Sequence, residues 1–263
     1  MSAFLIAFAL LQERVVLDLE EPLNVSCTVS KTIDEQSRVT ERSGRGPTTE
    51  YKTSATSTHR YEETLLARDV PQWRRRYLEA AESFTEDGRT TSRRPAFNGL
   101  TITLTKENGE TKIEGATLDK SDLAQLRLRD DPILASLPAS AIAPGAAWAI
   151  DSRRLAGQLA EQLGGFTVRR AEGTTEFRRW EKLDGERCAI LESSTRVEAV
   201  DARGAITVVA RNTVVHWYAP SRKTMIRIDG DGRHEISGTV TTQAGAQTVG
   251  GASTTTYRER RAY

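Results

Sequence analysis

The residues able to perform metal, acid–base or nucleophilic chemistry are few and lie far apart in this sequence. Its three histidines are His59, His216 and His234. Metal sites usually show short ligand spacings, such as a C-x-x-C pair or paired histidines, and neither is present. No serine stands in a G-x-S-x-G segment, the usual setting of a hydrolase nucleophile. The sequence therefore predicts no catalytic, cofactor or metal residue, and we expect a protein that is not an enzyme.

Acidic segments offer superficial matches to known sites. The run Asp229-Gly230-Asp231-Gly232 begins like a calcium loop, but Arg233 and His234 stand where an EF-hand needs an acid or amide and then a glycine. We interpret it as a hairpin turn. The pairs Glu62-Glu63 and Asp130-Asp131 are adjacent, and neighbours in a strand point to opposite faces. The sequence predicts that both pairs are solvated charges.

Two cysteines, Cys27 and Cys188, each lie among residues typical of a β-strand. A disulfide between them would close a very long loop and stabilise the fold by at most about 5 kcal/mol in the chain-entropy model. Two buried thiols that behave as small apolar groups are the alternative, because cysteine is among the most buried residue types. The sequence leaves both interpretations open.

Large aromatic residues supply the candidates for ligand binding. We expect Trp148, Trp217 and Tyr218 to line an apolar cleft between a curved sheet and covering helices, together with Trp73 and Trp180. The alternative is ordinary core packing, which the large apolar area of these side chains favours.

Charge and the first residues bear on partners and location. The chain has 37 basic and 36 acidic residues, so it lacks the positive field that phosphate backbones attract, and we expect no nucleic-acid partner. The apolar run at residues 3–11 would span about 14 Å as a helix, against about 30 Å of hydrocarbon, which excludes a transmembrane span there. We interpret residues 1–12 as a signal peptide, with a buried N-terminal segment as the alternative. An exported protein of the periplasm or cell envelope follows.

Hydrophobic periodicity and turn residues outline the elements. Alternation predicts strands over 23–33 and 53–66, and Asn108-Gly109 predicts a hairpin turn. Residues 71–84 fit either an amphipathic helix or a strand. Short helices are predicted over 119–128 and 151–163, and from residue 166 the chain forms a long meander with turn signals.

The predicted fold class is α+β and mostly β, with long curved antiparallel meander sheets of half-barrel form and two short helices between the halves. We expect one domain over 13–263. Its halves, about 13–117 and 165–263, are joined by a helical segment over 118–164.

Short motifs between Pro95 and Leu163 carry a resemblance. A strand start near Pro95 and Gly99 and the turn at Asn108-Gly109 precede a segment with Leu137-Pro138, Ile142, Gly145 and Trp148, and Asp184-Gly185 opens a later strand. This pattern resembles uncharacterised secreted bacterial β-rich proteins with an L-P-x-x-x-V-x-x-G-x-x-W segment. Those proteins are distantly similar to lipoprotein-carrier half-barrels, so the resemblance implies that fold and an envelope location.

Two functions follow as expectations, and an unrecognised enzyme, whose residues would have to converge in three dimensions, is third. The first is an envelope protein that binds an apolar small molecule or lipid in a cleft between sheet and helices. The second is a structural or interaction domain that pairs with a protein partner through exposed sheet edges.

Overall fold

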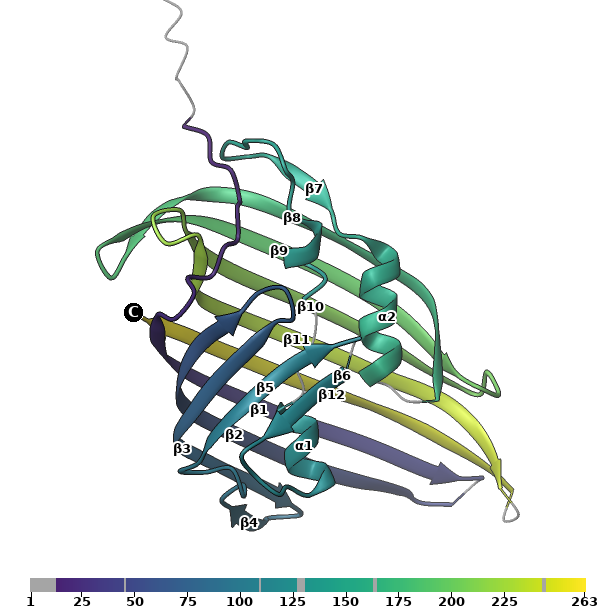
Figure 1. Cartoon of the computed structure of the whole chain (residues 1–263). Helices are drawn as coiled ribbons and strands as arrows, with labels where there is room; N and C mark the ends of the chain where they lie inside the picture. Colours follow the sequence, from purple (N-terminus) through teal and green to yellow (C-terminus); the bar gives the residue numbers. More distant parts are fainter. Residues whose placement is uncertain (1–12, 45, 109, 127–130, 163–164, 243–244) are drawn as a thin grey trace, which may run out of the picture.

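The computed structural model describes residues 13–44, 46–108, 110–126, 131–162, 165–242 and 245–263. The predicted signal peptide at residues 1–12 lies outside these ranges. A single 12-stranded sheet dominates the described part of the chain, and two short α-helices lie in front of it (Figure 1). The sheet is open and its named strands pair antiparallel, which confirms the predicted α+β, mostly β fold.

The sheet is a meander, and its first and last strands, β1 and β12, lie side by side in the middle of the sheet. Its order is β6-β5-β3-β2-β1-β12-β11-β10-β9-β8-β7, with β4 paired to β3. The bounds are β1 Ser26–Ser43, β2 Thr48–Ala67, β3 Gln72–Glu86, β4 Arg89–Arg93, β5 Thr101–Glu107, β6 Glu110–Glu114, β7 Ala147–Ala149, β8 Phe166–Leu183, β9 Glu186–Asp201, β10 Ile206–Ala219, β11 Thr224–Thr242 and β12 Gly245–Ala262.

Several turns and helix starts form as their residues dictate. Asp184 and Gly185 both have positive φ values, 50° and 86°, as a type I′ hairpin between β8 and β9 requires. Helix α2, Ser152–Gln162, begins after Asp151, whose carboxylate accepts the Arg153 backbone N–H at 2.8 Å. Helix α1 spans Lys120–Leu126. Both predicted helices are therefore present.

The structure resolves one open assignment and corrects another. Within residues 71–84, everything after Pro71 belongs to strand β3, because β2 and β5 pair with this segment and its side chains alternate between two faces. Residues 229–232, predicted as a hairpin turn, lie in the middle of β11. There they pair with β10 on one side and β12 on the other, so the glycines are inside a continuous ladder. The predicted turn is wrong.

Apolar side chains form two main clusters, one on each half of the sheet. One contains Val29, Tyr61, Tyr77 and Phe97 on the N-terminal half of the sheet. The other gathers Phe177, Leu191 and Tyr218 under the N-terminal segment that carries Val15 and Leu17. The first cluster lies across β1 to β5 and the second across β8 to β11, so each half of the sheet has its own packed layer.

We predict a large loss of stability for Phe177→Ala. Phe177 is 0% exposed, so the truncation removes buried area and leaves a cavity, which costs about 3–5 kcal/mol of unfolding free energy. Phe84 is 44% exposed, and Phe84→Ala is the matched control with an expected cost below about 1 kcal/mol. Urea unfolding followed by tryptophan fluorescence measures both. Equal losses in the two variants would contradict this account of the core.

Candidate functional site

Strand register and alternation fix which side chains share a face of the sheet. Leu155 of α2 packs against Val197, Val168 and Ala171, so the face carrying Val197 lies under the helix. We call this the inner face and its opposite the outer face. In Figure 1, α2 crosses in front of the central strands on this inner side.

The inner face holds a hollow of about 480 Å³ over β1, β12, β11 and β10. This volume lies within the range of small-molecule sites, about 300–1,000 Å³. Cross-strand pairing shows how its floor is built: Val214 pairs with Gly230, which pairs with Tyr257. Apolar groups make most of the walls, and the principal ones are Val39, Val208, Ala210, Val214, Ile236 and Tyr257.

Two glycines of β11 create this space. A Cβ at Gly230 would lie 3.6 Å from both Val214 Cγ2 and Tyr257 Cβ, so a larger side chain there would project into the hollow. A Cβ at Gly232 would lie 2.5 Å from Asn212 Oδ1, so the amide of Asn212 uses the room that Gly232 leaves. Glycine in a strand often marks such a close approach.

A few polar groups interrupt the apolar walls. His234 Nδ1 lies 3.4 Å from Ser253 Oγ, and Asn212 Nδ2 lies 3.5 Å from Thr195 Oγ1. Two residues beyond Val214 on the same face of β10, His216 is fully buried, and neither ring nitrogen has a hydrogen-bond partner among the described residues. Its Nε2 is 3.8 Å from Asp131 Oδ2. The arrangement suits an apolar ligand that carries a hydrogen-bonding group.

The aromatic residues predicted to line a cleft lie elsewhere. Tyr218 and Trp148 pack in the cluster around Phe177, and the Tyr218 hydroxyl donates to the Asp18 carbonyl at 2.8 Å. Trp217 packs with Cys188 and Ile190 in another cluster. None of the three is among the described residues that line the hollow. In the structure, Trp148, Trp217 and Tyr218 pack in these hydrophobic clusters.

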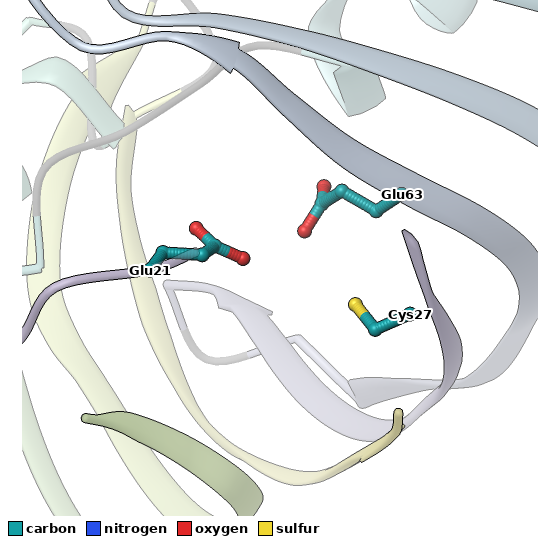
Figure 2. Close-up of side chains that lie close together, drawn as sticks. All are labelled: Glu21, Cys27 and Glu63. Carbon is teal, nitrogen blue, oxygen red and sulfur yellow. The ribbon is translucent and has the colours of Figure 1, made fainter. Parts of the chain in front are cut away.

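A second cluster of chemistry-bearing groups lies where β1, β2 and the N-terminal segment meet. Glu21, Cys27 and Glu63 point toward one another there (Figure 2), with one ligand-type atom of each within 4.8 Å of the others. Two carboxylates and a thiol form a set that could hold a metal ion. Sequence reasoning missed this cluster, because its members come from three segments.

Arginines and a protonated thiol make this cluster an ion-pair network instead. Glu63 accepts from Arg75 Nε at 2.5 Å, and Arg261 Nη1 lies 2.7 Å from Glu21 and 3.4 Å from Glu63. Burial raises the pKa of Cys27 to about 11, so the thiol keeps its proton at neutral pH. The carboxylate oxygens of Glu21 and Glu63 that a cation would need already accept hydrogen bonds from, or pair with, the guanidinium groups of Arg75 and Arg261.

This network corrects the prediction for the pair Glu62-Glu63. Glu63 is 2% exposed and Arg75 contacts it directly, whereas the Glu62 side chain is 38% exposed and pairs with Arg76 at 2.8 Å. Asp130, of the second pair, lies outside the described residues. Burial opposes ionisation of Glu63, but the charges of Arg75 and Arg261 outweigh it and lower its pKa.

Both cysteines are free buried thiols in the structure. Cys27 belongs to the cluster around Tyr61, and Cys188 to the cluster with Trp217. Of the two interpretations that the sequence leaves open, the structure has the buried thiols and no disulfide between these residues.

Comparison with known proteins gives only distant matches. No family model and no curated protein matches the sequence. Among solved structures, a DUF1329 family protein from Desulfovibrio piger is similar at 10% identity and a TM-score of 0.18, over 87% of this chain and 85% of that one. P47 from Clostridium botulinum A2 is similar at 6% identity and a TM-score of 0.16, over 81% of this chain and 76% of that one.

A third structure is OccK11 from Pseudomonas aeruginosa, at 6% identity and a TM-score of 0.23, over 95% of this chain and all 100% of that one. Overlaps this low carry no functional argument. Neither described helix has the length and apolar character needed to cross a bilayer. Function must therefore be argued from this chain's own geometry.

We predict that Glu63→Gln destabilises the fold far more than Glu62→Gln. Loss of the Glu63 charge leaves the buried Arg75 guanidinium without its anion, which costs about 3–5 kcal/mol. The Glu62 pair is exposed and contributes about 0–1 kcal/mol. Urea unfolding at pH 7 measures both variants. Similar small losses in both would show that the network is not holding the strands together.

His59 makes stability depend on pH. Its burial, with the nearby charge of Lys31, lowers its pKa to about 4, whereas Glu82 has the opposite effect. An unfolded histidine has a pKa near 6.5, so between about pH 6.5 and 4 the unfolded state binds more protons than the folded state. Stability therefore falls as pH falls through this window. The urea midpoint of the wild type should drop more than that of His59→Gln between pH 7 and pH 4.5, and parallel curves would refute the assignment.

Proposed function

We propose that this protein binds an apolar ligand, a lipid or similar amphiphile, in the hollow on its inner face. One observation carries the proposal: a space of about 480 Å³ whose exposed lining surface is mainly apolar, with the polar side chains of Ser37, Asn212, Asp231, His234, Glu235, Ser253 and Thr255 among the apolar ones. Ligand sites commonly combine a large apolar surface with a small number of placed polar groups. A binding role also agrees with an exported protein of the cell envelope, which we propose as its location.

The lining defines the ligand more closely. Val39, Val208 and Ile236 lie in one cross-strand row and give an apolar wall at one end of the hollow. His234 and Ser253, in the next row, offer hydrogen bonds to one polar head. A single-chain amphiphile has both parts, since its chain removes apolar area from water while its head group keeps hydrogen bonds.

The alternative function, pairing with a protein through the sheet edges, has less support. The sheet ends in β6 and β7, which are 5 and 3 residues long. Short edge strands are a common means of limiting edge-to-edge pairing. Envelope crosslinking that recovers a partner through β6 or β7 would favour this alternative over the ligand-binding proposal.

The test is binding of a dansylated undecanoic acid to delipidated protein, followed by fluorescence titration. Ala210 lines the hollow and Val209 points to the outer face, so Ala210→Phe and Val209→Phe add the same bulk on opposite sides of β10. We expect Kd to rise at least tenfold in Ala210→Phe and less than twofold in Val209→Phe. Gly230→Val, whose Cβ would meet only ordinary contacts at 3.6 Å, is a second filling variant.

Two controls make the result decisive. Circular dichroism and urea unfolding confirm that each variant keeps the fold. The proposal fails if folded wild-type protein shows no saturable probe binding and native mass spectrometry of purified protein finds no bound lipid. It also fails if both filling variants bind the probe as tightly as the wild type.

A further inference from the structure

The outer face of the sheet carries three arginines at directly paired positions on three neighbouring strands. Arg196 of β9 pairs with Arg211 of β10, and Arg211 pairs with Arg233 of β11. Adjacent strands are about 4.8 Å apart, so this row places three guanidinium groups within about 10 Å of backbone. Like charges directly opposite each other destabilise a sheet, so a bound anion would stabilise such a row.

The protein supplies too little negative charge to this row. Arg211 and Arg233 share a single carboxylate, that of Glu235, at 3.2 and 3.1 Å. Arg196 forms no ion pair with a residue that the structure describes, and its buried Nε has no hydrogen-bond partner there. Three guanidinium groups therefore face one carboxylate.

Nearby acids are engaged with other arginines. Glu172, which pairs with Arg196 across the strands, binds the Arg170 guanidinium at 2.7 Å. Asp231, at the other end of the groove, lies 3.4 Å from Arg258. Glu172 closes the arginine row at its β8 end, and Asp231, which pairs with Thr213, closes the neighbouring row at its β11 end.

A row of hydroxyl groups runs beside the arginines on the same face. Thr174, Ser194 and Thr213 are paired across β8, β9 and β10, two residues along each strand from the positions of Glu172, Arg196 and Arg211. The two rows wall a depression of about 690 Å³, whose floor is the strand backbone between them. Hydroxyl donors opposite planar guanidinium groups provide what the oxygens of a phosphate or sulfate group accept.

We propose that this depression, the arginine groove, binds the phosphate or sulfate group of an anionic ligand, with Arg196 and Arg211 as its principal contacts. Guanidinium groups suit this task because they donate two parallel hydrogen bonds to such oxygens. Glu172 and Asp231, at opposite ends of the two neighbouring rows, favour one compact anionic group over a long polyanion. The principal arginines of the groove lie on the other face of the strands from the hollow, although Asn212, Asp231 and Gly232 line both.

The first test compares inorganic phosphate with chloride at equal ionic strength in thermal unfolding. We expect phosphate to raise the melting temperature of the wild type by several degrees more than chloride does, because only the folded state has the groove. The double variant Arg196→Gln, Arg211→Gln should lose this difference. The control Arg38→Gln, Arg178→Gln removes the same charge from paired arginines outside the groove and should keep it.

A second arm separates two sources of the anionic group. Sedimentation with phosphatidylglycerol vesicles, against phosphatidylcholine vesicles, tests a lipid headgroup, and binding should fall at least fivefold in the groove variant. Binding to vesicles assigns the headgroup, and a response to phosphate alone assigns a free anion.

Removing the positive charges of Arg196 and Arg211 should also change the stability of the protein in the absence of phosphate. The groove variant should be at least as stable as the wild type in chloride, whereas a purely structural arginine row would make it less stable. The proposal is overturned if phosphate and vesicles both act equally on wild type, groove variant and control, or if the variant unfolds more readily in chloride.

Discussion

The pairing of β1 with β12 is the contact on which the rest of the structure depends. It joins the first and last long strands over sixteen paired positions, from Thr28 with Ala262 to Ser43 with Gln247. A slip of one residue would turn every inner side chain outward, because side chains alternate along a strand. The hollow needs Val39 beside Gly251, which this register provides, and Tyr257 beside Gly230, which the β11–β12 register provides.

The buried ion-pair network helps to fix that register. Arg261 of β12 reaches Glu63 of β2 across β1, and its Nε binds Glu259 at 3.0 Å. The charge of Arg261 outweighs the burial of Glu259 and lowers its pKa to about 2, so the anion persists at any physiological pH. A shifted register would leave these charges buried without partners, at a cost of several kcal/mol. Apolar contacts alone would discriminate less sharply between registers.

Much of the fold could be predicted from the sequence, but the hollow could not. Local signals such as Asp184-Gly185 and the capping Asp151 act within a few residues, so they identify hairpins and helix starts. Gly230 and Gly232 are also strong local turn signals, yet here the neighbouring strands override them. Their role becomes visible only when β10 and β12 lie on either side, because Val214 and Tyr257 border the space at Gly230 and Asn212 borders the space at Gly232. The arginine groove depends in the same way on register.

Because side chains alternate along a strand, one strand contributes residues to sites on both faces of the sheet. On β10, Ala210 borders the hollow, Arg211 and Thr213 belong to the arginine groove, and Asn212 between them lines both. One layer of peptide backbone separates the two, and its hydrogen bonds are used within the sheet. A substitution at position 210 therefore changes volume on the inner face, while one at position 211 changes charge on the outer face. Neighbouring residues in the sequence can thus be tested as parts of independent sites.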